Sequence, residues 1–250
     1  MKGIIMAGGE GSRLRPLTAD IPKPMVPVAN KPAIKHIVEH LHKYGIKDLA
    51  VTLFYLPQKI KKYLEEEYGD EIKFYIEDKP LGTAGSVKNA RDFLNDTFIV
   101  MSGDVITDVN IKEAYEFHRK KGAKVTLILT RVDVPLEYGV VIVDEEGKIK
   151  KFLEKPSWGE VFSDTVNTGI YIIEPEILEF IPQDKPFDFS KDLFPMLLKN
   201  DIPMYGYITG GYWCDIGNTN QYITSHFDIL EGRVDLGYKD KLLKKGKVIG

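Results

Sequence analysis

The first half of the chain alternates short, continuous apolar runs with segments whose apolar residues recur at helical spacing. Runs of this kind are typical of parallel strands that are buried on both faces. The expected strands are residues 2–7, 48–55, 72–77, 98–102 and 125–129, and the expected helices are residues 32–44, 57–68, 83–94 and 110–121. This alternation predicts an α/β domain with helices on both faces of its sheet.

The pattern changes in the second half of the chain. Two apolar segments, 138–144 and 148–153, flank the turn Glu145-Glu146-Gly147 and predict an antiparallel hairpin. Further along, the pattern predicts strands at 165–173 and 204–209 and helices at 190–199 and 218–230. We therefore expect one α/β domain over residues 1–231 that carries an antiparallel insertion, followed by a Lys-rich tail over residues 232–250.

Composition narrows the class of protein. Lys and Arg number 34 against 37 Asp and Glu, so the net charge is −3 and gives no basic footprint for nucleic acid. No apolar run approaches the ~18 residues of a membrane span, so a membrane is not expected as a partner either. The single cysteine, Cys214, excludes an internal disulfide and makes a reducing cytoplasm the simplest location.

The segment between Ala7 and Pro32 shows no helical or strand period, although it is longer than the ~12–15 residues usual for a structureless connection. It combines glycines with cations: Gly8, Gly9, Gly11, Arg13, Arg15 and Lys23. Glycines let backbone N–H groups approach a ligand closely and cations balance its charge, so this combination suits a polyphosphate. Neither the third glycine of the dinucleotide fingerprint nor a P-loop is present.

The run GGEGSRLRPLT at residues 8–18, followed by PKPM at 22–25, resembles the signature of sugar-1-phosphate nucleotidyltransferases, also called nucleotide-sugar pyrophosphorylases. The resemblance implies a Rossmann-like, mixed but mainly parallel sheet whose small antiparallel insertion binds a sugar. It also implies that Arg13 holds the phosphates of a nucleoside triphosphate and that Lys23 contacts the reacting phosphates. The nucleotide would be bound by Ala7, Gly8, Gly9, Gly11 and Ser12, where the family usually has Thr in place of Ser12.

Three later motifs extend the resemblance on the nucleotide side. Gly82 and Thr83 match a segment that lies over the nucleobase, although Thr83 could equally cap the following helix. Asp104 and Asp215 match the two carboxylates that hold Mg²⁺, with a helix or turn cap as the alternative role of each. Ile106 stands where glycosyltransferases of related fold carry the second acid of Asp-x-Asp, which counts against that class.

On the sugar side, the resemblance assigns Lys155 to the sugar phosphate and assigns sugar contacts to Gly139, Glu154, Asn167 and Thr168. The alternatives are an exposed ion pair for Glu154 and Lys155 and a strand-edge bulge for Asn167–Gly169. The five histidines show no metal-binding spacing and are interpreted as structural: His36, His40, His42, His118 and His226.

The implied reaction converts a nucleoside triphosphate and a sugar 1-phosphate into a nucleotide-sugar and pyrophosphate, with Mg²⁺ as cofactor. The catalytic residues would be Arg13, Lys23, Asp104 and Lys155. The segment Pro80–Gly85 is closest to the mannose-1-phosphate guanylyltransferase branch, which favours GTP with mannose 1-phosphate. The alternatives are dTTP or UTP with glucose 1-phosphate, and a non-catalytic regulatory homologue that binds nucleotide-sugar.

The last four residues, Lys247–Gly250, resemble the opening of a hexapeptide left-handed β-helix. A single partial rung cannot bury a core, because such arrays need about three repeats. We therefore expect residues 232–250 to be a stub of a truncated β-helix, and a homo-oligomer is left open.

Overall fold

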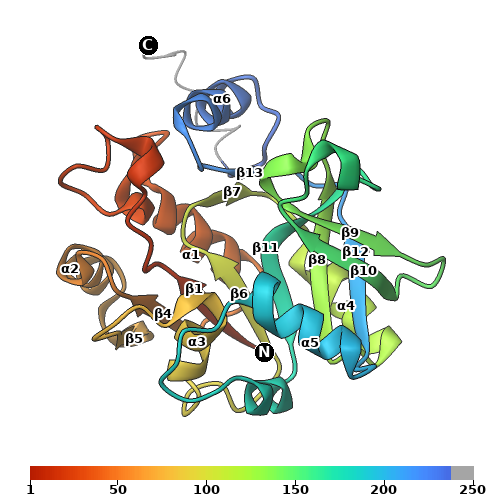
Figure 1. Cartoon of the computed structure of the whole chain (residues 1–250). Coiled ribbons are helices and arrows are strands. Elements are labelled where there is room, and N and C mark those ends of the chain that lie inside the picture. Colours follow the sequence, from red (N-terminus) through yellow and green to blue (C-terminus); the bar gives the residue numbers. More distant parts are fainter. Residues whose placement is uncertain (238–250) are drawn as a thin grey trace.

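A nine-stranded mixed sheet forms the centre of residues 1–237, the part of the chain that the computed structural model describes (Figure 1). The β-helix opening expected at Lys247–Gly250 lies outside the described residues. The strands of the sheet are β1 (Lys2–Met6), β4 (Leu49–Leu53), β5 (Ile72–Ile76), β6 (Phe98–Ser102), β8 (Val125–Arg131), β9 (Gly139–Val143), β10 (Ile149–Glu154), β11 (Thr165–Ile173) and β12 (Met204–Ile208). The predicted α/β class is therefore confirmed.

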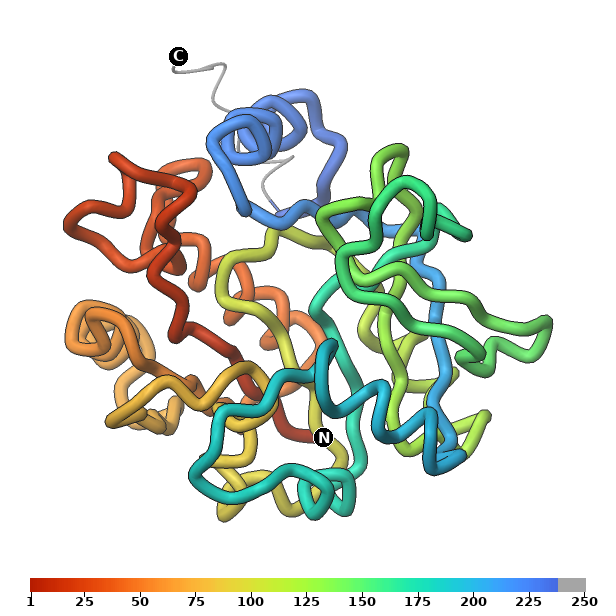
Figure 2. The backbone as a smooth tube through the Cα atoms, in the orientation of Figure 1, coloured from red at the N-terminus to blue at the C-terminus, as the bar shows by residue number. Residues whose placement is uncertain are grey.

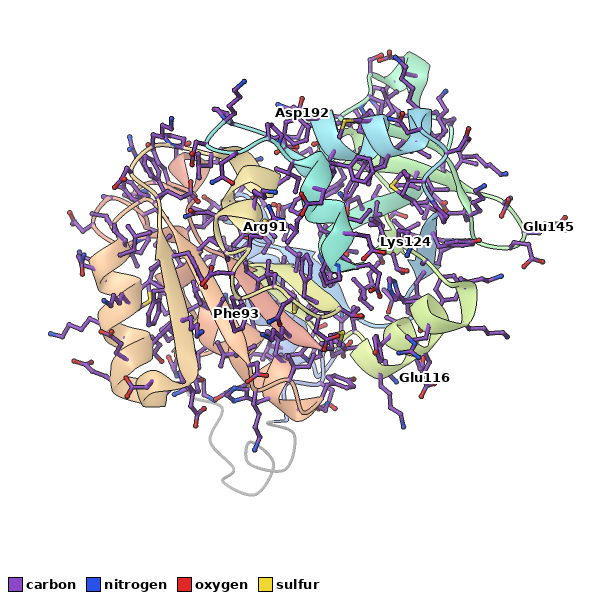
Figure 3. The ribbon with its side chains drawn as sticks, turned by 90° about the horizontal axis from the view of Figure 1, so that it is seen from below. Arg91, Phe93, Glu116, Lys124, Glu145 and Asp192 are labelled. Carbon is purple, nitrogen blue, oxygen red and sulfur yellow. The ribbon has the colours of Figure 1, made fainter. Side chains whose placement is uncertain are left out.

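The sheet combines a parallel half with an antiparallel half. Strands run in the order β10-β9-β11-β6-β1-β4-β5, and β8 pairs with both β11 and β12. The pairs among β1, β4, β5 and β6 are parallel, whereas β11 is antiparallel to β6 and β8. The predicted hairpin, β9 with β10, joins the sheet through β11 and so extends it, and Glu145 lies at the projecting tip of its turn (Figure 3).

Helices cover both faces of the sheet. Neighbouring residues of a strand point to opposite sides, so the continuous apolar strands make both faces apolar. Ile5 packs on the face covered by α1 (Ala33–Lys43), α2 (Pro57–Tyr68) and α4 (Ile111–Lys121). Ile4 packs on the opposite face, beneath α3 (Gly82–Asn89) and α5 (Phe194–Lys199). A last helix, α6 (Thr219–Leu230), lies at the edge of the molecule next to the first loop, which connects β1 to α1 (Figure 2).

Local signals explain where the helices begin and end. The Asn110 side chain accepts a hydrogen bond from the backbone N–H of Glu113 and so caps α4, which ends at Gly122 with φ of 56°. Asn218 caps α6 in the same way, through the N–H of Gln221. Because Asn218 fills this position, the alternative in which Asp215 caps α6 is wrong.

Two helices are shorter than the sequence pattern predicts. The helix expected at 83–94 ends at Asn89, and it begins at Gly82 without a side-chain cap, so the capping role considered for Thr83 is wrong. The helix expected at 190–199 is the short α5, preceded by a π-helical turn over Phe189–Leu193. The Asp188 side chain caps this turn by accepting hydrogen bonds from two backbone N–H groups. These local bonds explain the altered start.

The loop between β1 and α1 is ordered by short elements. It contains 3-10 turns at Ser12–Leu14 and Lys23–Met25 and a two-stranded ladder of β2 (Pro27–Val28) with β3 (Lys31–Pro32). A second small sheet, also absent from the prediction, pairs β7 (Val105–Thr107) with β13 (Trp213–Asp215) in antiparallel fashion. Within residues 1–237, no helix has both the length and the apolar character needed to cross a membrane.

An aromatic cluster fixes α5 against the sheet. The Phe194 side chain is fully buried, and its ring lies 5.0 Å from that of Tyr171 and 5.6 Å from those of Phe152 and Phe189. We expect Phe194→Ala to lower the free energy of unfolding by about 3–5 kcal/mol, because it leaves a cavity. Urea denaturation measures this loss. The control Phe227→Ala, at a ring that is 59% exposed, should change stability little, and equal losses would contradict this assignment.

Candidate active site

A cavity of about 330 Å³ opens at the carboxyl ends of the parallel strands, where open α/β sheets bind their ligands. Residues at or just after the carboxyl ends of strands β1, β4, β5 and β6 form much of its wall. The remainder comes from the first loop, the start of α3 and the segment before α5. The lining residues are Met6, Ala7, Gly8, Gly9, Lys23, Pro24, Phe54, Glu77, Pro80, Leu81, Gly82, Thr83, Ser86, Ser102, Asp104 and Asp188.

The glycine loop packs directly against the arm of Lys23. Gly11 has a left-handed backbone with φ of 67°, and a Cβ atom added there would lie 2.8 Å from the Lys23 Cβ. The Thr18 hydroxyl donates a hydrogen bond to the Gly11 carbonyl at 2.7 Å and closes the loop. A larger residue at position 11 would therefore be strained and would displace Lys23.

Lys23, in the wall of the cavity, pairs with two carboxylates. Its Nζ contacts Asp104 Oδ2 and lies 3.4 Å from Asp215 Oδ1. The Ser102 hydroxyl donates to Asp104 Oδ1 at 2.6 Å. The side chain of Lys23 is only 11% exposed and that of Asp104 only 17%, so these charges interact in a poorly solvated environment.

The three groups shift one another's pKa. Burial by itself would raise the pKa of Asp104, but the charge and hydrogen bond of Lys23 bring it below the ordinary value. Burial raises the pKa of Asp215, and the negative charge of Asp104 adds to this effect. Burial works against the charge of Lys23, yet the two carboxylates raise its pKa above the ordinary value. The lysine is therefore held as a cation between two acids.

The β7–β13 ladder brings Asp215 to Asp104. Asp215 stands opposite Val105 in this ladder, and the N–H of Ile216 donates to the Asp104 carbonyl at 3.1 Å. Arg13 lies close enough for its charge to lower the pKa of Asp215 against the effect of burial. The predicted pair of carboxylates thus meets, although its members come from opposite halves of the chain.

These two carboxylates fit the donor chemistry of Mg²⁺. Mg²⁺ prefers oxygen ligands and is commonly held by one or two carboxylates, with substrate phosphates and water completing the shell. The negative charge of Asp104 lies close enough to Asp215 to add to the effect of burial in raising its pKa. A bound cation would balance these two like charges. Within residues 1–237, no group of three or more His, Cys, Asp or Glu side chains is placed to hold a metal, so Asp104 and Asp215 would supply only part of a shell.

A second polar cluster lies beside this cavity. Gly139 pairs with Glu154 in the hairpin, and a Cβ at Gly139 would lie 2.8 Å from Glu154 Oε2, so the glycine leaves room for that carboxylate. Burial raises the pKa of Glu154, and a hydrogen bond with Ser190 opposes this shift. Asn167 Nδ2 lies 3.4 Å from Ser190 Oγ and 3.0 Å from the Tyr171 hydroxyl. Glu154 and Asn167 therefore meet at Ser190.

The other sugar-side candidates differ in what they can offer a ligand. Lys155 is exposed and has a left-handed backbone, with φ of 47°. The Thr168 hydroxyl is buried, donates to the Ile128 carbonyl at 2.7 Å and accepts from the Ile170 N–H. The register of β11 against β8 shifts between Asn167 and Tyr171, so the bulge considered at this place is present.

The structure therefore gathers most, but not all, of the predicted nucleotide residues. Seven of them line the cavity: Ala7, Gly8, Gly9, Lys23, Gly82, Thr83 and Asp104. Four others lie outside its lining: Gly11, Ser12, Arg13 and Asp215. The sugar-side candidates lie outside it as well. Thr83 holds the cavity wall, because its hydroxyl donates to Asp188 Oδ2 at 2.8 Å and accepts from the Phe189 N–H at 2.9 Å.

Two acidic residues of the cavity were not predicted. Glu77 is buried at the carboxyl end of β5, where its Oε2 accepts the Leu81 N–H at 3.0 Å, and burial raises its pKa. Its place at the end of a predicted parallel strand was a usable signal. Asp188 precedes the π-helical turn in a segment without clear periodicity, and the sequence offers no comparable signal for it.

Three of the five histidines make buried hydrogen bonds within the fold, and the cysteine is kept as a thiol. His36 and His40 are buried and bond to the carbonyls of Val28 and Val109, and His118 bonds to Thr126 and Glu174. Burial raises the pKa of Cys214 to about 11, which keeps its thiol protonated at neutral pH.

The chain belongs to the nucleotidyl transferase family, whose model matches residues 2–232. It is 40% identical over 233 residues to a mannose-1-phosphate guanyltransferase of Saccharomyces cerevisiae, covering 90% of this chain and 63% of that protein. It is 38% identical over 238 residues to a UTP–glucose-1-phosphate uridylyltransferase of Synechocystis, covering 89% of this chain and 61% of that protein. The chain thus spans less than two thirds of the length of these relatives.

Among solved structures, HddC from Yersinia pseudotuberculosis in complex with GMP-PN superposes with a TM-score of 0.77 at 28% identity. The match covers 91% of this chain and 99% of that one. The fold predicted from the alternation of strands and helices is therefore shared with this structure.

We expect Lys23→Met to lower the free energy of unfolding by about 3–5 kcal/mol at pH 7, because it leaves two buried carboxylates without a counter-charge. Urea denaturation measures this loss. The control Lys121→Met removes a surface pair with Glu146, and its cost should stay below about 1 kcal/mol. Similar values for both variants would mean that Lys23 does not balance the carboxylates.

Proposed function

We propose that this chain is a Mg²⁺-dependent sugar-1-phosphate nucleotidyltransferase that forms a nucleotide-sugar and pyrophosphate. The observation that carries the proposal is the meeting of Lys23 and Asp104, in the wall of a cavity also lined by Gly8 and Gly9, with Asp215. This arrangement offers cations, backbone N–H groups and a carboxylate pair where a triphosphate would lie.

The chemistry requires two anions to react. An oxygen of the sugar phosphate attacks the α-phosphorus, the bond to the β-phosphate oxygen breaks, and pyrophosphate leaves. The attacking phosphate is largely ionised at neutral pH, since its second pKa is about 6, so no general base is required. Catalysis then depends on positioning and charge stabilisation.

This chain's own residues divide that task. Arg13 and the loop N–H groups hold the triphosphate, Lys155 orients the sugar phosphate, and Lys23 stabilises the charge that develops in the transition state. When bound, Mg²⁺ supplies positive charge at the α-phosphate, and Asp104 and Asp215 would hold it. On the sugar side, Gly139, Glu154 and Asn167 contact the hydroxyl groups, whereas the hydroxyl of Thr168 is already bonded within the fold.

We propose GTP and mannose 1-phosphate as the substrate pair. The carboxylate of Glu77 supports guanine, because a carboxylate only accepts hydrogen bonds and guanine presents two neighbouring N–H donors on its Watson–Crick edge. Uracil and thymine present one N–H between two carbonyl oxygens, which a carboxylate would repel. The name of the Saccharomyces cerevisiae relative supports the same pair, and that of the Synechocystis relative supports UTP with glucose 1-phosphate as the alternative.

A non-catalytic regulator is the alternative of another class. Such a protein has no need for Lys23 or the carboxylate pair, and all three are present and placed together. The single cysteine supports a reducing cytoplasm as the proposed compartment.

One assay tests both the reaction and its substrates. Pyrophosphate release is measured with GTP, UTP, dTTP, CTP and ATP, each against mannose 1-phosphate and glucose 1-phosphate, with and without Mg²⁺. We expect the fastest release from GTP with mannose 1-phosphate and none after Mg²⁺ is removed by a chelator. Nucleotide binding without release from any pair would favour the regulator.

We expect Glu77→Gln to shift base preference. A glutamine side chain offers one acceptor and one donor, which match the edge of uracil or thymine better than that of guanine. The kcat/KM for GTP should fall about 10- to 100-fold, in line with the loss of a charged hydrogen bond, while that for UTP falls less or rises. The matched control is Asp78→Asn, at the neighbouring exposed acid outside the cavity lining. An unchanged GTP-to-UTP ratio in Glu77→Gln would remove Glu77 from base recognition.

A further inference from the structure

We propose that Asp108 is a positioning residue that sets where Asp215 stands relative to Asp104 and Lys23. The proposal rests on the metal-binding role proposed above for Asp104 and Asp215. Asp108 directly follows β7 and does not line the cavity, so it acts through β13 rather than on a substrate.

Asp108 anchors the start of β13 through both its backbone and its side chain. Its Oδ1 accepts the N–H of Tyr212 at 2.6 Å, and its own N–H donates to the Tyr212 carbonyl at 3.2 Å. The hydroxyl of Thr107 donates to the same carbonyl at 2.7 Å. Tyr212 is the residue immediately before β13, so these bonds set the register in which Asp215 comes to lie opposite Val105.

The second oxygen of the same carboxylate binds the segment that follows α6. Asp108 Oδ2 accepts the N–H of Asp235 at 2.8 Å. One side chain therefore holds residues 212 and 235, the two ends of the segment that contains β13, Asp215 and α6. Inside this segment, the Tyr212 hydroxyl donates to Asp228 Oδ2 at 2.7 Å, and Arg233 pairs with Asp228 at 2.9 Å.

The junction has little room to adjust. A Cβ atom at Gly211 would lie 2.9 Å from Asp108 Oδ1 and 3.0 Å from the Cα of Val109. The β7–β13 ladder pairs only three residues on each side, so it has few hydrogen bonds of its own with which to hold its register. The anchor at its start therefore decides how closely the Asp215 carboxylate approaches Asp104.

A carboxylate is required because two separate N–H groups are held at once. Asparagine at position 108 would keep one acceptor oxygen and could serve Tyr212 or Asp235, but not both. Loss of groups that orient a metal ligand typically weakens metal binding 10- to 100-fold. The inference therefore predicts a graded loss of metal affinity from wild type through Asp108→Asn to Asp108→Ala.

The test is titration of the whole chain with Mn²⁺ alone. Electron paramagnetic resonance of the free ion monitors binding. We expect Mn²⁺ affinity to fall 10- to 100-fold in Asp108→Ala and by an intermediate factor in Asp108→Asn. Gly211→Ala, which crowds the same carboxylate from the segment before β13, should resemble Asp108→Asn and serves if Asp108→Ala does not fold. The matched control is Asn110→Ala, which removes the cap of α4 two residues away and should leave Mn²⁺ affinity unchanged.

Wild-type affinity in Asp108→Ala would overturn the inference, as would an equal loss in Asn110→Ala or an absence of Mn²⁺ binding by the wild-type chain. Failure of the proposed function gives a different result. In that case, the graded loss of Mn²⁺ affinity is seen, but the wild-type chain releases no pyrophosphate from any substrate pair.

Discussion

The ammonium group of Lys23, held between the carboxylates of Asp104 and Asp215, is the interaction on which the candidate site depends. Two buried acids at close range repel each other, and the lysine supplies the charge that lets both remain near the cavity. Each of the three residues comes from a different part of the chain: the first loop, the end of β6 and the end of β13. The sheet's carboxyl edge is the place where these parts can meet.

The same edge also brings the proposed nucleotide side and the proposed sugar side together. Asp188 lines the cavity and accepts a hydrogen bond from Thr83. Ser190, two residues later, forms hydrogen bonds with Glu154 and Asn167. A single short segment before α5 therefore contacts both halves of the site. The aromatic packing of Phe194 against the sheet holds this segment in place.

Strong periodicity made most of the fold predictable. Strands such as 98–102 and 165–173 and the helix 57–68 were predicted at their observed bounds, because each shows a clear period or has a proline or glycine at its end. The strands β7 and β13 are three residues long, which is too short to show any period. The role of Thr83 was missed for a related reason, since its partners, Asp188 and Phe189, are remote in sequence. Of the residues singled out by sequence, Gly8, Gly9, Lys23 and Asp104 line the cavity, whereas Gly11 and Arg13 do not. Asp188 lines it too, from a segment that carries no periodic signal in the sequence.

The β7–β13 ladder also bears on the order in which the molecule can form. Val105 lies in the middle of the chain and Asp215 near the end of the domain, so their pairing joins segments that leave the ribosome far apart in time. The glycine loop, β1, β4, β5 and β6 can assemble from the first half of the chain alone. A nascent chain can therefore build much of the wall of the cavity early, but the Asp215 carboxylate joins Asp104 only when translation of the domain is nearly finished.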